Sequence, residues 1–174
     1  MTQLVQSTLE DVREPQTAKR TRRGRVAALS VLALAMIAGA AGILGVHAGT
    51  VATNSNGYRL TVVYPHVARA GQDVPWRATV FHQGGFGQGD VTLAVSSHYF
   101  DIFDTQAWHP EPDMETATPN YYYLSFSAPP GDTLEVSYDT YIQPSAQLGR
   151  RADVVLIVDN KEVARTSYRT WLVP

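Results

Sequence analysis

The sequence predicts an all-β fold, an immunoglobulin-like antiparallel β-sandwich, preceded by one N-terminal transmembrane helix. Three observations lead to this prediction. An uncharged apolar run, Val26 to Val46, follows a cluster of basic residues. From residue 57 onward, short runs of alternating apolar and polar residues are separated by turn motifs, a pattern typical of antiparallel strands. No helical periodicity is visible after residue 48, and seven or eight strands in about 120 residues favour a sandwich over an α+β fold.

The apolar run is long enough to cross a lipid bilayer. As a helix, its 21 residues span about 31 Å, close to the thickness of the hydrocarbon core. Five Lys and Arg residues lie within positions 19–25, and none follows the run before Arg59. Because positive charge stays on the cytoplasmic side, we predict a single-pass protein of the cell membrane. It has a cytoplasmic basic tail over 1–25, a signal-anchor helix over 26–47 and an extracytoplasmic C-terminal part.

The alternative for the apolar run is a signal peptide that is removed from the mature protein. Val46-His47-Ala48 has the small residues of a cleavage site, so cleavage after Ala48 is compatible with the sequence. The apolar run and the polar segment before it are both longer than in ordinary signal peptides, which favours an uncleaved anchor. In both cases the rest of the chain is exported.

Small residues recur on one face of the predicted anchor helix. They follow i, i+3, i+4 spacing, which lets another helix approach closely. This face is a candidate docking surface for a membrane partner or a second copy. The alternative is that Ala and Gly are simply common in export segments. The residues concerned are Ala35, Ala38, Gly39, Gly42 and Gly45.

The exported part is predicted to be a short linker over 48–56, followed by a β-sandwich over 57–174. Trp76 and Trp171 lie on predicted strands in which apolar and polar residues alternate. They are predicted to fill the core, because aromatic side chains bury a large area. Asp159-Asn160-Lys161 is short enough to join the last two strands in a hairpin.

Charge and composition exclude several functions. Residues 49–174 carry a net charge of −5, whereas the basic surplus is confined to the N-terminal tail, so nucleic acid is not an expected partner. The chain has no cysteine, which excludes disulfides, thiolate nucleophiles and cysteine-ligated metal centres. No cofactor motif and no catalytic constellation is visible, so we expect neither a cofactor nor an enzyme.

One loop is a weak candidate for a cation or metal site, because it crowds carboxylates around one imidazole. Its spacing does not match an EF-hand, and two prolines stiffen it, so a solvated acidic loop is the favoured interpretation. The candidate ligands are Asp101, Asp104, His109, Glu111 and Asp113.

Two further features are candidate protein-contact sites. Phe86 lies in a glycine-rich loop, either as a contact tip or within a plain hairpin loop. Tyr121 and Tyr123 are predicted to face outward on a strand whose other face, Tyr122 to Phe126 in alternation, packs in the core. Tyrosine is enriched at protein interfaces, although it is also simply common in strands.

Six local motifs are distributed along the predicted sandwich. They are Tyr58-Arg59-Leu60-Thr61-Val62, Pro75-Trp76, Gly84-Gly85-Phe86, Tyr99-Phe100-Asp101, Pro130-Gly131-Asp132 and Tyr168-Arg169-Thr170-Trp171. These motifs resemble those of exported, membrane-anchored immunoglobulin-like proteins of high-GC Gram-positive bacteria. The resemblance implies a small accessory partner of other membrane proteins and supplies no active-site residues.

The leading hypothesis is therefore a non-enzymatic, membrane-anchored accessory module that associates with another membrane or envelope protein. A second hypothesis is an extracytoplasmic sensor that binds a ligand or a metal through the acidic loop. A third is an envelope enzyme whose site follows no motif visible in the sequence.

Overall fold

The computed structural model describes residues 17–40, 46–104 and 107–173. The chain divides into two compact units, Met1–Gly45 and Val46–Pro174, here called the helical unit and the sandwich unit. This boundary differs from the predicted one, because the sandwich begins at residue 46 instead of residue 57.

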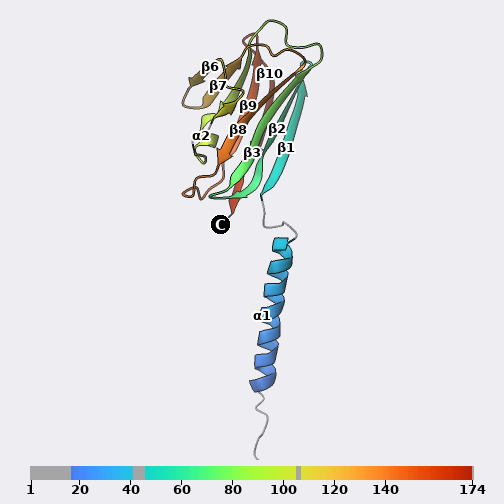
Figure 1. The fold of residues 1–174 in the computed structure, drawn as a ribbon, viewed down its shortest axis with the longest axis vertical. Helices are drawn as coiled ribbons and strands as arrows, with labels where there is room; N and C mark the ends of the chain where they lie inside the picture. The colour runs from blue at the N-terminus through green and yellow to red at the C-terminus, as the bar shows by residue number, and fades with distance from the viewer. Residues whose placement is uncertain (1–16, 41–45, 105–106, 174) are drawn as a thin grey trace, which may run out of the picture. The chain divides into compact units, whose positions relative to one another are not determined.

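The described part of the helical unit is one helix, α1 (Thr17–Ala40), shown in Figure 1. It begins before the predicted anchor, so residues 17–25 of the predicted tail are helical. Residues 41–45 of the predicted anchor lie outside the described residues, and His47, its predicted end, belongs to a strand. No helix in the described residues is both long enough and apolar enough to cross a membrane.

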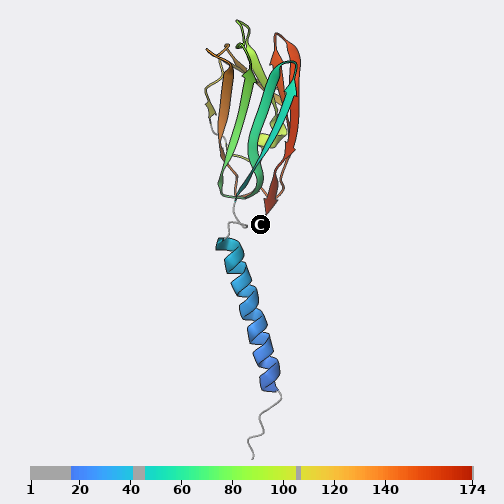
Figure 2. The ribbon, with the colours of Figure 1, turned by 90° about the vertical axis from the view of Figure 1, so that its right-hand side faces the viewer.

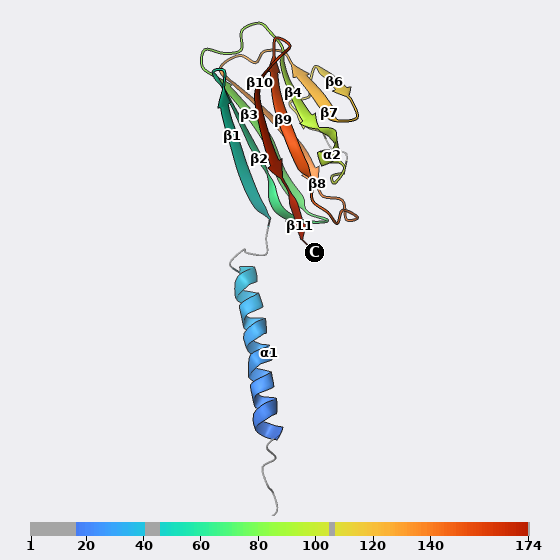
Figure 3. The same ribbon diagram turned by 180° about the vertical axis from the view of Figure 1, so that it is seen from behind.

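The sandwich unit consists of two sheets, seen from two sides in Figures 1 and 2. Neighbouring strands run antiparallel, except that β11 lies parallel to the end of β2, as Figure 3 shows. The first sheet has the order β1 (His47–Ser55), β2 (Tyr58–Arg69), β3 (Asp73–His82), β8 (Thr133–Tyr141), β5 (Trp108–His109), with β11 (Trp171–Val173) beside β2. The second sheet has the order β10 (Lys161–Arg169), β9 (Arg151–Val158), β4 (Val91–Ser96), β7 (Tyr121–Phe126), β6 (Met114–Ala117). The predicted two-sheet, all-β architecture is confirmed for this unit.

The core lies between the sheets and is built by the predicted alternation of apolar side chains. Trp76 on β3 is 2% exposed, which confirms its predicted place in the core. Trp171 was expected there as well, but it is 48% exposed. From Ala164 onward the even-numbered residues of β10 point inward, and Leu172 continues this set, so Trp171 points outward. The Arg169 guanidinium covers its ring, 3.8 Å from the ring centroid.

The segment predicted as a linker, 48–56, forms most of strand β1, which is hydrogen-bonded to β2 along its whole length. A two-residue turn, Asn56-Gly57, joins the two strands with φ values of 52° and 81°. Both values suit a type I′ hairpin turn, which favours the Asn-Gly dipeptide. The prediction of a linker over 48–56 is therefore wrong. Its residues are small and weakly apolar, but pairing with β2 holds them in a strand.

The predicted hairpin of the last two long strands is confirmed. β9 and β10 pair antiparallel, and the connecting residues Asp159 and Asn160 have φ values of 49° and 59°. Directly after β4 the chain forms one helical turn, α2 (Ser97–Phe100). This turn buries Tyr99 and Phe100 in the core.

A buried polar network links the two sheets. The Trp76 indole N–H donates to the hydroxyl of Tyr168 on the opposite sheet, at 2.5 Å. The hydroxyls of Tyr99 and Thr170 lie 2.9 Å apart, and Thr170 also donates to the carbonyl of Pro65 at 2.6 Å. Burial raises the pKa of both Tyr99 and Tyr168, so these phenols stay neutral and act as hydrogen-bonding groups.

Candidate functional site

The outer face of the second sheet carries a distinctive group of exposed and half-buried polar and aromatic side chains. In the strand register, Arg165 of β10 pairs with Val155 of β9, Val155 pairs with Ala94 of β4, and Ala94 pairs with Tyr123 of β7. Residues paired in register point to the same face of a sheet, so these side chains form one row across four strands. Val155 and Ala94 are only 4% and 2% exposed although they face outward, so larger neighbours cover the middle of the row.

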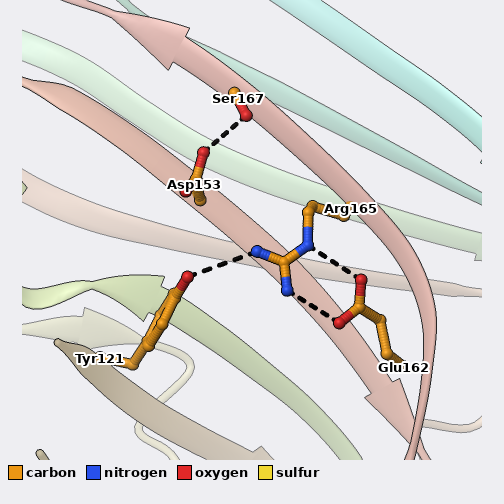
Figure 4. Close-up of polar contacts among 5 residues, drawn as sticks. All are labelled: Tyr121, Asp153, Glu162, Arg165 and Ser167. Carbon is orange, nitrogen blue, oxygen red and sulfur yellow. Dashed lines mark hydrogen bonds and ion pairs between the residues drawn. The ribbon is translucent and has the colours of Figure 1, made fainter.

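Arg165 is held in place by two neighbours, as Figure 4 shows. Its Nε and Nη2 atoms donate to the two carboxylate oxygens of Glu162, at 2.9 and 2.8 Å. Its Nη1 donates to the hydroxyl of Tyr121 on β7, at 3.3 Å. These bonds lower the pKa of Glu162 and raise that of Arg165. Because both charged side chains are nearly half exposed, the pair orients Arg165 more than it stabilises the fold.

A second set of hydrogen bonds fixes the adjoining part of this face. Ser167 on β10 donates to the carboxylate of Asp153 on β9 at 2.6 Å (Figure 4). The backbone N–H of Asp153 in turn donates to the hydroxyl of Ser96, at 2.9 Å. The face is therefore a polar and aromatic surface whose side chains already have defined positions. We call it the Tyr–Arg face, defined by Tyr121, Tyr123, Asp153, Glu162, Arg165 and Ser167.

The prediction that Tyr121 and Tyr123 face outward is confirmed. Leu124 and Phe126 of the same strand are buried, whereas the two tyrosines are half-buried with ring centroids 6.1 Å apart. The sequence analysis did not identify Arg165 or Glu162. Residues three apart on a regular strand point to opposite faces, but a register shift between Glu162 and Ala164 places both on the outer face.

Phe86 is not a contact tip. It is 6% exposed and packs against the rings of Tyr58 and His82, at centroid distances of 6.4 and 6.3 Å. The His82 ring also makes a hydrogen bond from Nδ1 to the carbonyl of Gly85, at 2.6 Å. The loop is folded back onto the sandwich, so the prediction of Phe86 as a contact residue is wrong.

The five candidate metal ligands are not assembled into one site. No group of three or more His, Asp or Glu side chains in the described residues lies close enough together to hold a metal ion. His109 pairs with Asp139 at 3.1 Å, and Asp101 lies 3.6 Å from His98. Asp113 accepts hydrogen bonds from the backbone and hydroxyl of Ser127, at 2.6 and 2.8 Å, and both bonds lower its pKa.

The two remaining acidic-loop candidates also have separate surroundings. Asp104 is exposed, and its backbone N–H donates to the carbonyl of Tyr141. Glu111 lines an open cleft with Trp108 and Tyr138. Within the described residues, the five candidate ligands therefore do not converge on one point.

The small-residue face of the helix is only partly described. Ala35 and Gly39 are exposed on α1, and Ala38 belongs to the same helix. Gly42 and Gly45 lie outside the described residues. The helical docking face therefore stays a prediction.

Comparisons with known proteins identify no family for this chain. No model of a known protein family matches it, and no curated protein matches it. Among solved structures, the chain is similar to the alkylpurine DNA glycosylase AlkC of Pseudomonas fluorescens bound to DNA containing an abasic site analogue. The identity is 13% and the TM-score is 0.31, over 63% of this chain and 28% of that one. This chain thus spans little more than a quarter of that protein, and so low a score supports no inference about fold or function.

Proposed function

We propose that the protein is a non-enzymatic accessory module of the cell membrane. One helix anchors it with its N-terminus in the cytoplasm, and the sandwich unit presents the Tyr–Arg face to another membrane or envelope protein. The observation that carries this proposal is the pre-positioned Arg165, held between Glu162 and Tyr121 on the outer face of the second sheet.

The strand order supports the finer assignment of the sandwich as immunoglobulin-like. β2, β3 and β8 follow the order of strands A, B and E in that fold, and β10, β9, β4 and β7 follow the order G, F, C and C′. β1 is an additional strand that pairs with β2, the strand in position A, on the side away from β3. This order also agrees with the family resemblance suggested by the sequence motifs.

The side chains of α1 support the membrane anchor. Seven large apolar residues on this helix are each more than half exposed, and α1 is the only described element of the helical unit. A helix that is apolar on all sides is typical of a lipid environment. The uncharged sequence continues to Val46, and the basic cluster before it gives the orientation. The seven residues are Val26, Leu29, Val31, Leu32, Leu34, Met36 and Ile37.

The composition of the Tyr–Arg face supports a protein partner. Tyrosine and arginine are among the residue types that most often dominate binding energy at protein interfaces. Binding through side chains that already have one conformation loses less entropy than binding through mobile ones. The hydrogen bonds of Arg165 and Ser167 provide this pre-organisation. A partner confined to the same membrane meets the face at a raised effective concentration.

Site-specific photo-crosslinking of the full chain in its native cells tests this function. A benzoylphenylalanine in place of Tyr123 is expected to form an adduct with one membrane or envelope protein. The matched control places the same group at Phe81, an exposed aromatic position on the outer face of the first sheet. Arg165→Ala is expected to weaken the adduct strongly, because truncating an interface arginine costs about 2 kcal/mol. Equal adducts from both positions, or none from Tyr123, would contradict the proposal.

A further inference from the structure

An open cleft of about 600 Å³ lies at one edge of the sandwich unit. At this edge β5 pairs with β8 in the first sheet, and β6 pairs with β7 in the second. The segment from β5 to β6 thus passes from one sheet to the other and borders the cleft. Its walls are therefore contributed by both sheets and by α2.

The walls of the cleft are mainly aromatic. The rings of Trp108 and Tyr138 lie 4.2 Å apart, and Phe100 packs against both, at 5.3 and 5.1 Å. Tyr122 adds a further ring, 6.1 Å from Phe100. Trp108, Tyr122 and Tyr138 are only half-buried, so parts of their surfaces remain accessible from the cleft. The face of an aromatic ring carries partial negative charge and attracts cations.

Two carboxylates, Glu111 and Glu115, lie among the lining residues of this cleft. Neither makes a hydrogen bond or an ion pair with another described residue, whereas the neighbouring His109 is engaged by Asp139. Both glutamates are exposed. Their negative charge is thus available to a ligand in the cleft.

The charge of the whole region agrees with a cationic ligand. From residue 78 to residue 149 the chain contains nine Asp and Glu residues and no Lys or Arg. This stretch includes β4 to β8 and therefore every residue that lines the cleft. The basic residues of the sandwich unit lie on β2, β3, β9 and β10 or directly before β9. An anionic ligand would meet repulsion here, and a cation would meet attraction.

We propose that this cleft binds a small organic cation that carries an alkylammonium group. Aromatic faces suit a weakly hydrated organic cation, whereas a divalent metal ion requires several convergent oxygen ligands. The volume of the cleft falls within the range of small-molecule sites. This site is distinct from the Tyr–Arg face and does not depend on the proposed protein partner.

A titration of the full chain with choline, in a non-ionic detergent, tests this inference. The chain has three tryptophans, so nuclear magnetic resonance resolves at most three indole N–H signals. Trp108 lines the cleft, whereas Trp76 is buried and Trp171 lies under Arg169. Saturable movement of the Trp108 signal alone is expected, and Trp108→Phe assigns that signal. No movement, or equal movement of all three signals, would overturn the proposal.

Two controls separate recognition of charge from simple apolar contact. The neutral isostere 3,3-dimethylbutanol has the shape of choline without its charge, and it is expected to bind at least about fivefold more weakly. The double variant Glu111→Gln, Glu115→Gln is expected to weaken choline binding by about fivefold as well. Glu135→Gln, which removes a carboxylate paired with Arg77 outside the cleft, is expected to leave it unchanged. Equal binding of choline and its isostere would overturn the proposal.

A third comparison tests the source of the alkylammonium group. N-acetyl-lysine amide represents a lysine side chain of a protein partner, and choline represents a free small molecule. Tighter binding of choline is expected, because a quaternary ammonium is more weakly hydrated and contacts several rings at once. Tighter binding of the lysine amide would overturn the assignment to a small-molecule ligand.

Discussion

At the scale of single residues, the sandwich depends on one buried hydrogen bond between its sheets. Tyr168 accepts the indole hydrogen of Trp76, and its ring stacks on Tyr64 with centroids 4.4 Å apart. Tyr168→Phe keeps the ring but leaves the indole without its partner in the core. We expect it to lower the free energy of unfolding by about 1–3 kcal/mol, measured by urea denaturation of the full chain in detergent. The control Tyr123→Phe, on the outer face, should change it by less than about 0.5 kcal/mol. Equal stability of the two variants would contradict this role.

The carboxylate of Asp113 is expected to stabilise the folded protein at neutral pH and to lose this effect in acid. Two hydrogen bonds from Ser127 lower the pKa of this carboxyl in the folded chain below its ordinary value of 3.8. As the pH falls, the unfolded chain therefore takes up the proton first. The contribution of Asp113 to stability is therefore fully present when the pH is above its ordinary pKa. It is lost as the pH falls through the lower pKa of the folded chain.

Melting temperatures measured between about pH 5 and pH 2.5 test this contribution. They should decline less steeply in Asp113→Asn than in the unaltered protein. Asp90→Asn is the matched control for loss of one carboxylate and should decline as the unaltered protein does. Parallel curves for all three proteins would show that the contact with Ser127 does not contribute.

At the scale of elements, β1 is an integral strand of the first sheet. Gly49 pairs with Tyr64 of β2, and a Cβ atom at Gly49 would lie only 2.7 Å from the ring of that tyrosine. Gly49→Val is therefore expected to push the ring or the strand aside and to cost about 1–3 kcal/mol of stability. Ala52→Val, at an exposed position of the same strand, should change stability by less than about 0.5 kcal/mol. Similar urea midpoints for the two variants would argue against close packing of β1.

The elements that could be predicted from the sequence are those with strong alternation. β3 and β10 have this pattern, and the turn signal at 159–161 correctly joined the last hairpin. β1 has mostly small side chains, so its pairing with β2 is a tertiary effect that alternation does not reveal. The Asn56-Gly57 dipeptide was a signal that could have identified this hairpin.

The candidate site was also predictable only in part, because alternation within a strand is visible in the sequence but the pairing of distant strands is not. Tyr121 and Tyr123 lie on a strand whose inward face is clearly apolar, so their outward direction follows from alternation. The contact of Arg165 with Tyr121 depends on strand order and on the bulge near Glu162, neither of which has a local sequence signature. The aromatic cleft likewise gathers residues from β5, β7, β8 and α2, which are far apart in the chain.

At the scale of the whole molecule, the uneven distribution of charge leads to a prediction about topology. The five basic residues at 19–25 precede an uncharged run, and the sandwich unit carries a net charge of −5. Because the apolar run is long enough to span a bilayer, the full chain should remain with the membrane after an alkaline carbonate wash. Because Lys and Arg resist translocation, its sandwich unit should lie outside the cytoplasm.

The lack of native cysteine makes this topology directly measurable. A single Gln147→Cys, at an exposed position, should react with a membrane-impermeant maleimide in intact cells, and Thr2→Cys should react only after lysis. Replacing Arg22, Arg23 and Arg25 with Glu should reduce labelling of Gln147→Cys, because the charge difference across the apolar run is then lost. Arg59→Glu, a charge reversal within the sandwich unit, is the matched control and should not change the labelling. A Gln147→Cys chain that is protected in intact cells and extracted by carbonate would show that residues 26–46 do not anchor the protein.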